Sequence, residues 1–172
     1  MTLVLPKPGQ IGFAHTSGIM GKMIRFGEAL KGKVGSEWNH AFIVSDEVSD
    51  TGEPLIIQAT LRGVTGNAPL SSVAPGGKYT ILETPGVDLA KTLEFAKSTV
   101  GLEYGYFTIL AIAIDILSFQ WVPAFRGARK DSWICSALAA EALRFGGWLQ
   151  EWIDVYTITP QQLYDRLSTP SP

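Results

Sequence analysis

Cysteine and histidine are scarce in this sequence of 172 residues. It contains one cysteine, Cys135, and two histidines, His15 and His40. A single cysteine excludes an intrachain disulfide, and one thiol with two imidazoles argues against a four-ligand structural zinc site. We therefore expect no metal and no other cofactor. Cys135 is then either inert packing or a group that takes part in chemistry.

An excess of charge of one sign is also missing. Lys and Arg number 14 against 16 Asp and Glu, a formal net charge of −2, and nucleic-acid-binding chains usually carry a basic stripe. Nucleic acid is therefore not an expected partner. With 46% hydrophobic and 17% charged residues the chain can bury a sizeable core, which excludes disorder of the whole chain. The length predicts one domain over residues 1–167, followed by a disordered tail over 168–172.

Long uninterrupted hydrophobic runs are absent as well. Residues 106–125 are apolar but include Asp115, Gln120 and Pro123, so they fall short of the roughly 20 residues of a membrane span. The segment completes the core, forms a wall or lid for an acyl chain, or makes a peripheral membrane contact. The chain start lacks the features of a signal peptide. We expect a cytoplasmic protein by default, with delivery by lysis or in a virion as the alternative.

Two common enzyme motifs are not found. The sequence has no G-x-S-x-G, so a serine nucleophile on a strand-to-helix elbow has no support. Residues 27–34 approach a phosphate-binding loop, but Val34 stands where a hydroxyl must reach Mg²⁺, and a helical pattern precedes the segment. Neither a serine hydrolase nor a nucleotide-binding protein is expected.

The apolar pattern predicts an α+β fold in which most strands precede most helices. Short apolar runs predict strands over 11–14, 40–44, 55–60 and 79–83, with the second and third joined as a hairpin. Steps of three and four residues predict four helices, over 19–30, from the N-cap Asp88 to Val100, from Ser132 to Phe145, and from the N-cap Thr159 to Leu167.

Cys135 lies in the first turn of one predicted helix. If Ser132 is the N-cap, the thiol is at the third helical position, where unpaired amides and the helix dipole favour a thiolate. Such an environment can lower a thiol pKa from about 8.5 toward 3.5–7.5. The alternative is a small buried hydrophobe in an alanine-rich helix. The helix alone leaves both interpretations open.

A thiol nucleophile needs a base, and His40 begins the first strand of the predicted hairpin. A symmetric hairpin would set Gln58 directly opposite His40 on the same face, with Cβ atoms about 4.5–5.5 Å apart. The glutamine could then accept from the far ring N–H and fix the histidine tautomer. The alternative is a histidine at a strand end with a solvent-facing glutamine. His15 is an ordinary residue at a strand end, or lines a cleft.

Six segments in chain order carry a resemblance to a known family: Pro8-Gly9-Gln10-Ile11, Trp38 to Val44, Ile57 to Thr60 with Gly63-Val64, Gly101 to Tyr104, Cys135 to Leu138, and Thr159-Pro160. They resemble the P-G-D-I strand, the W-S-H-x-G-I-V strand, the V-x-E-A…G-V segment, G-x-x-Y-D, the C-S-E-L helix and the closing T-P of the circularly permuted NlpC/P60 branch of papain-like cysteine hydrolases. In that branch the histidine precedes the cysteine. The resemblance implies a permuted papain-like fold, an antiparallel sheet or half-barrel packed against helices.

The resemblance implies Cys135 as nucleophile, His40 as general base and Gln58 as the residue that orients the base. Tyr104, Ser136 and His15 are the candidates for substrate or oxyanion contacts, the first two from these motifs.

Three positions depart from the family pattern: Gln58 and Gln10 each replace an acidic residue, and Gly105 replaces the aspartate that follows the tyrosine. An amide at position 58 still orients a base but stabilises an imidazolium less than a carboxylate does.

We therefore predict a thiol hydrolase or acyltransferase that acts on an amide or ester. The resemblance suggests cell-wall peptides or lipid-linked acyl groups as substrates. The alternative is a non-catalytic binding or structural module of the same fold, such as a phage-encoded protein. The oligomeric state is not predicted.

Overall fold

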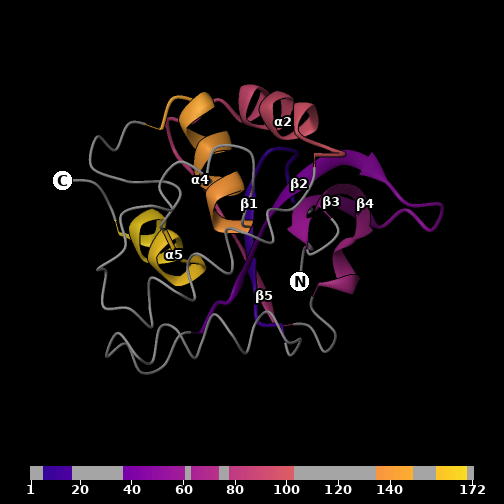
Figure 1. Ribbon diagram of the computed structural model, residues 1–172, viewed down its shortest axis with the longest axis horizontal. Coiled ribbons are helices and arrows are strands. Elements are labelled where there is room, and N and C mark those ends of the chain that lie inside the picture. The colour runs from indigo at the N-terminus through magenta and orange to yellow at the C-terminus, as the bar shows by residue number, and fades with distance from the viewer. Residues whose placement is uncertain are drawn as a thin grey trace, which may run out of the picture.

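The computed structural model describes residues 6–16, 37–60, 63–73, 78–102, 135–148 and 158–169. Its elements, in chain order, are β1 (Ile11–Ala14), β2 (His40–Val48), β3 (Pro54–Thr60), β4 (Gly63–Pro69), the 3₁₀ turn η1 (Leu70–Ser72), β5 (Tyr79–Leu82), α2 (Leu89–Ser98), α4 (Cys135–Phe145) and α5 (Pro160–Ser168). The strands form one antiparallel sheet in the order β4-β3-β2-β1-β5, with α4 and α5 against it and α2 beside α4 (Figure 1). The predicted α+β class is confirmed.

Strand β2 lies in the middle of the sheet and is buried on both faces over its first half. Ala41 and Ile43 belong to the core cluster on the helix side, and Phe42 and Val44 belong to a second cluster that includes η1. Successive strand side chains point to opposite faces, so a strand covered on both sides needs an unbroken apolar run. This explains why His40 is followed by four apolar residues.

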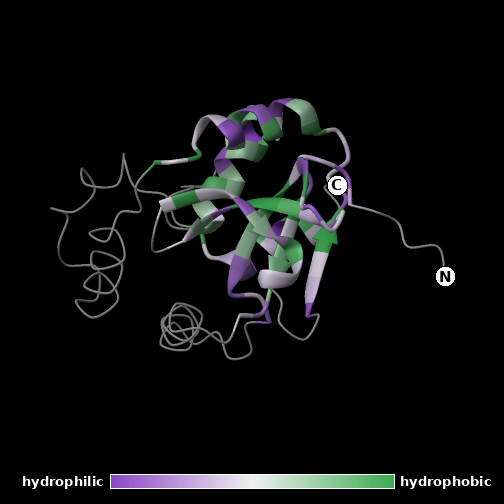
Figure 2. Ribbon diagram, turned by 90° about the vertical axis from the view of Figure 1, so that its right-hand side faces the viewer, coloured by the Kyte–Doolittle hydropathy of each residue, from purple (hydrophilic) through white to green (hydrophobic). Residues whose placement is uncertain are grey.

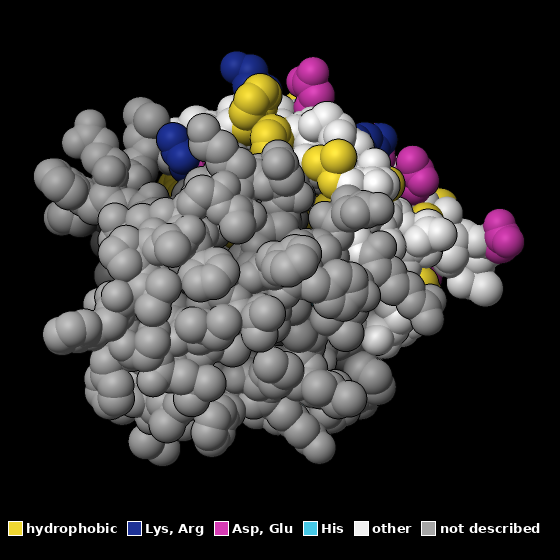
Figure 3. All heavy atoms as spheres, viewed as in Figure 1, with side chains coloured by type: hydrophobic (Ala, Val, Ile, Leu, Met, Phe, Trp, Pro, Cys, Tyr) yellow, Lys and Arg dark blue, Asp and Glu magenta, His cyan; other side chains and the backbone are white. Residues whose placement is uncertain are grey.

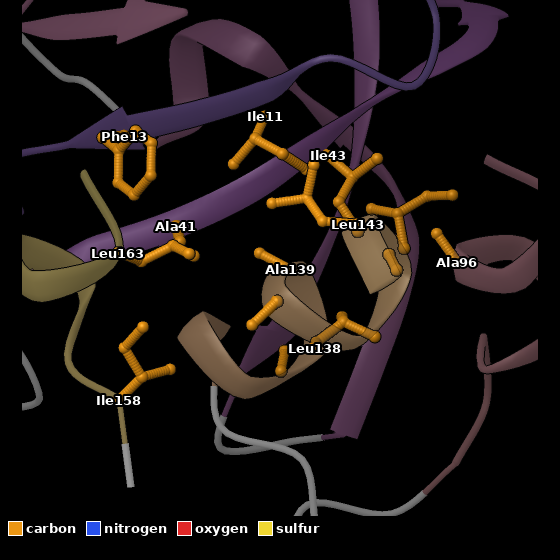
Figure 4. Packing of buried hydrophobic residues seen from close by; sticks show 14 of the residues in the cluster. Ile11, Phe13, Ala41, Ile43, Ala96, Leu138, Ala139, Leu143, Ile158 and Leu163 are labelled. Carbon is orange, nitrogen blue, oxygen red and sulfur yellow. The ribbon is translucent and has the colours of Figure 1, made fainter. Parts of the chain in front are cut away.

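The main core lies between the sheet and helix α4. Figure 4 shows the side chains that meet there, from the sheet Ile11, Ala41 and Ile43 and from the helix Leu138, Ala139 and Leu143. Small alanines on α4 let the helix approach the strands closely, while its leucines fill the space between them. In Figure 2 the strands in the middle of the molecule are accordingly strongly hydrophobic. The helix that carries Cys135 is thus held firmly on the sheet.

The predicted N-caps of α2 and α5 are confirmed, whereas α2 ends at Ser98, two residues before the predicted Val100. The Asp88 side chain accepts from the Lys91 amide at the start of α2. At the start of α5, Thr159 and Gln162 form a reciprocal capping box, with Pro160 as the first helical residue. Helix α4 is followed by Gly147 at φ +92°, a left-handed conformation that favours glycine.

Strand β4 and the turn η1 were not predicted from the sequence, which indicated a loop from Thr60 to Tyr79. The strand pairs with β3 from Thr60↔Gly63 to Leu55↔Pro69, with one register irregularity. Its Gly and Pro residues have low strand propensity, and backbone hydrogen bonds to β3 override that preference. The loop of the β2–β3 hairpin is also shorter than predicted, because β2 continues to Val48.

Two predicted segments differ from, or lie outside, the described structure. Helix α5 runs to Ser168, and Thr169 closes it by donating its backbone N–H and its hydroxyl to the Asp165 carbonyl. The first two residues of the expected tail are therefore part of the helix end. The predicted helix over 19–30 lies outside the described residues.

The described surface mixes acidic and basic side chains. Lys97 of α2 pairs with Asp46 of β2 at 2.6 Å, and Lys91 approaches Asp88 at 3.9 Å. The Lys97 ammonium lowers the pKa of Asp46 below its ordinary value. Figure 3 shows Lys or Arg and Asp or Glu side chains interspersed over the coloured part of the surface. Among the described helices, none combines the length and apolar character needed to cross a membrane.

Replacing Leu143 with alanine tests the packing of α4 on the sheet. Leu143 is fully buried, so Leu143→Ala leaves a cavity and we expect the free energy of unfolding to fall by about 2–5 kcal/mol. Phe145 in the same helix is 58% exposed and rests on Phe95, so Phe145→Ala should cost less than about 1.5 kcal/mol. Equilibrium denaturation measures both, and equal losses would contradict this packing.

Candidate active site

Three polar side chains come together at the start of α4, beside strands β2 and β3. Cys135 is the first described residue of α4, His40 is the first residue of β2, and Gln58 lies in β3. Helix α4 packs on both strands, which brings the three elements into contact. Cys135 and Gln58 are buried, at 6% and 8% exposure, while His40 is partly exposed.

His40 and Gln58 are joined by a short hydrogen bond. The ring Nε2 of His40 lies 2.7 Å from Oε1 of Gln58. An amide oxygen only accepts, so Nε2 carries the proton and donates it. In the neutral ring the other nitrogen, Nδ1, is then an unprotonated acceptor. Gln58 thus selects the tautomer that a general base needs.

The strand register differs from the one predicted by a symmetric hairpin. Ile43 pairs with Ile57, and continuing this pairing along the strands brings His40 opposite Thr60, two residues beyond Gln58. The difference arises because the turn is centred near residue 51, midway between the paired Val48 and Pro54, whereas the symmetric hairpin was centred at residue 49. The register shift between Val44 and Val48 offsets only part of this difference. A shift of two residues keeps both side chains on the same face of the sheet. They are therefore diagonal neighbours, and the length of the glutamine spans the larger separation.

The Cys135 thiol lies close enough to the His40 side chain for hydrogen bonding and charge to shift the pKa values of both groups. Since Gln58 occupies Nε2, Nδ1 is the ring nitrogen left to face the sulfur. Burial raises the pKa of Cys135, but the hydrogen bond and positive charge of His40, with backbone amides of Ala41 and Ser136, lower it by more. The net result is a thiol pKa below its ordinary value.

The pKa of His40 shifts in the opposite direction to that of the thiol. Burial lowers the pKa of His40, and its hydrogen bond to Cys135, the thiolate charge and the hydrogen bond to Gln58 together raise it by more. A raised imidazole pKa and a lowered thiol pKa both favour the thiolate–imidazolium pair. The arrangement can therefore supply a nucleophilic sulfur and a proton donor at the same place.

Ser136 was a candidate for substrate contact, but its side chain is not accessible to a substrate. Its side chain is fully buried, and its hydroxyl donates to the Ile158 carbonyl at 2.6 Å. The hydroxyl therefore ties α4 to the segment that enters α5. Its backbone amide is the part that faces the thiol.

The other sequence candidates lie apart from these contacts or outside the described residues. The carbonyl of Glu37 accepts from the His15 Nδ1 at 2.9 Å, and the backbone N–H of His15 donates to Lys78. His15 follows β1, whose Ala14 pairs with His40, so it lies at the same end of the sheet as the thiol–imidazole pair. Its role in lining a cleft stays a prediction. Tyr104, the cap Ser132 and the apolar segment 106–125 lie outside the described residues.

Sequence reasoning missed Asn39, which directly precedes His40. Asn39 is 1% exposed, and its side-chain oxygen accepts from the Thr16 amide and hydroxyl while its amide group donates to the Thr16 carbonyl. These three bonds fasten the chain after β1 to the start of β2. The available signal was an asparagine directly before a candidate base. Its burial and its partner, Thr16, could not be read from the sequence.

The described residues hold no candidate metal centre, and comparisons with known proteins assign no family. Within the described ranges, no group of three or more His, Cys, Asp or Glu side chains is placed to hold a metal ion. The chain matches no family model, and no curated protein matches it. The chemistry of the site is therefore argued from its own residues.

Removal of the imidazole should raise the thiol pKa. In His40→Ala, burial continues to oppose the thiolate while the largest stabilising partner is lost, so the sulfur is protonated to a higher pH. Iodoacetamide alkylation against pH reports this directly, because Cys135 is the only thiol. We expect the apparent pKa to rise by at least about one unit. Phe145→Ala, an exposed change at the far end of α4, is the control and should leave the curve unchanged, whereas equal curves for wild type and His40→Ala would contradict the pairing.

Two substitutions at Gln58 should shift the pKa of His40 in opposite directions. Gln58→Leu removes a hydrogen bond that raises the His40 pKa, so the imidazolium should lose its proton at a lower pH than in the wild type. Gln58→Glu places a carboxylate on Nε2 and should raise the pKa by about 1–3 units. Titration of the His40 ring protons by NMR measures both shifts. The same pKa in both variants would rule out the contact.

Proposed function

We propose that this protein is a cysteine hydrolase that cleaves an amide or ester bond with Cys135, His40 and Gln58. One observation carries the proposal: the only thiol interacts with a histidine whose other ring nitrogen is hydrogen-bonded to a buried glutamine. Both contacts suit the reaction: the Gln58 amide orients the His40 ring, and the ring faces the Cys135 sulfur, from which it can take a proton. Structural packing of a cysteine requires neither contact.

The first half of the reaction acylates the thiol. The Cys135 thiolate attacks the substrate carbonyl carbon, a carbon–sulfur bond forms, and the carbonyl π electrons move to oxygen. Backbone amides of Ala41 and Ser136, which interact with the sulfur in the free protein, are the candidate donors for this negative charge. The intermediate then collapses, the bond to the leaving group breaks, and the His40 imidazolium protonates the departing amine or alcohol.

The second half returns the enzyme to its starting state. Neutral His40 accepts a proton from water as the water oxygen attacks the thioester carbon, and collapse of this second intermediate expels the thiolate with release of a carboxylic acid. His40 is then again an imidazolium beside the thiolate. If an alcohol or amine replaces water, the same steps transfer the acyl group instead.

The described fold supports a permuted papain-like arrangement. A five-stranded antiparallel sheet carries the base near its start, and the nucleophile helix follows the sheet in the chain. The histidine-before-cysteine order and the α5 start at Thr159-Pro160 agree with the resemblance seen in the sequence. Cell-wall peptide amides and lipid-linked acyl groups are the two substrate classes that this resemblance implies.

Replacing the nucleophile should abolish turnover while leaving the fold intact. Cys135→Ala removes the only sulfur, so we expect the rate of muropeptide or acyl-ester hydrolysis to fall at least about 10³-fold. Phe145→Ala is the matched control, because it changes an exposed side chain at the far end of the same helix. Full activity in Cys135→Ala would contradict the mechanism, and saturable binding of peptidoglycan fragments without cleavage by the wild type would favour the non-catalytic module.

The substrate class can be separated by one further comparison. Clear muropeptide cleavage with no flotation on liposomes assigns the cell-wall class. Flotation together with release of acyl chains assigns the lipid-linked class.

A further inference from the structure

Helix α5 is hydrogen-bonded to the chain that leads into the base strand. The Gln161 side-chain oxygen accepts from two consecutive backbone amides, Glu37 at 2.8 Å and Trp38 at 3.0 Å. The other end of the same side chain donates to Asp165 at 2.8 Å, which fixes its orientation. One glutamine thus clamps the backbone two to three residues before His40.

The clamped residues lie just outside the sheet. The pairing of β1 with β2 ends at Ala14↔His40, and the Asn39 amide makes the last backbone bond to β1. Residues 37 and 38 are held from α5, by Gln161 and by the packing of the Trp38 ring against Tyr164 at 5.5 Å, while the Glu37 carbonyl also accepts from His15. The approach of the chain to His40 therefore depends in part on α5.

The same end of α5 is also tied to the nucleophile helix. Ser136, next to Cys135, donates its hydroxyl to the Ile158 carbonyl, one residue before the N-cap Thr159. This bond and the two bonds of Gln161 lie within four residues of one another along the chain. The start of α5 is therefore bonded to a neighbour of the nucleophile and to neighbours of the base.

We propose that residues 158–161, the start of α5, form a brace that sets the separation of Cys135 and His40, with Gln161 as its positioning residue. The inference rests on the proposed function. Gln161 acts through the backbone before His40 and makes no described contact with the thiol. A misplacement of reacting groups by about 1 Å can cost roughly 10²-fold in rate, so such a brace affects chemistry well before it affects folding.

The experiment compares two adjacent glutamines. Gln161→Ala removes the clamp, whereas Gln162→Ala removes the capping bond to Thr159 and weakens the same helix without touching residues 37 and 38. The readouts are the melting temperature and the pH dependence of Cys135 alkylation, which needs no substrate. We expect similar melting temperatures for the two variants. Only Gln161→Ala should raise the apparent thiol pKa, by about one unit.

A charge-matched pair provides the rescue. Gln161→Glu retains an acceptor for the two amides but sets a carboxylate against Asp165, so it should weaken the clamp. The double variant Gln161→Glu/Asp165→Asn supplies a donor to that carboxylate and should return the thiol pKa to the wild-type value. Failure of the rescue would overturn the role of Gln161.

The outcomes separate the brace from the proposed function. A low wild-type thiol pKa that is unchanged in Gln161→Ala overturns the brace alone, and an equal shift in Gln162→Ala overturns Gln161 as its positioning residue. An ordinary thiol pKa in the wild type, unaffected by every variant, contradicts the proposed function itself.

Discussion

The contact between the Cys135 thiol and the His40 ring joins helix α4 to the sheet, and the polar side chains around it hold both groups in place. Gln58 holds the far ring nitrogen at 2.7 Å and thereby leaves Nδ1 for the sulfur. Burial alone would keep both groups neutral, because it raises the thiol pKa and lowers the imidazole pKa. The opposite shifts therefore arise because each group stabilises the charge of the other.

The apolar core gives this pair a rigid support on two sides. Strand β2 is covered on both faces immediately after His40, and α4 packs on the sheet through alanines and leucines immediately after Cys135. Both polar residues thus lie at the ends of elements whose remaining residues are fixed by packing. The start of α5 closes the arrangement through Ser136 and Gln161. A site at element ends combines a rigid frame with polar groups that the core would not tolerate.

The proximity of Cys135, His40 and Gln58 could be expected from the sequence because groups able to perform thiol chemistry are few and the alternation of strand side chains fixes their faces. A register error of two residues left Gln58 on the correct face, whereas an error of one would not have done so. Strand β4 could not be predicted, since its glycines and proline favour a loop and its pairing with β3 is a tertiary effect. The role of Gln161 was also hidden. A helical pattern shows that the residue lies in a first turn, but its partners are more than 120 residues away in the chain.

In the thiolate–imidazolium pair, Cys135 and His40 each shift the pKa of the other. Titration of His40 by NMR in the wild type and in Cys135→Ala tests this directly. The thiolate raises the pKa of His40 through a hydrogen bond and through its charge, and burial opposes both. Without the sulfur, burial has less to oppose it, so the account predicts that His40 loses its proton at a lower pH in Cys135→Ala than in the wild type. The same His40 pKa in both proteins would contradict the thiolate–imidazolium pair.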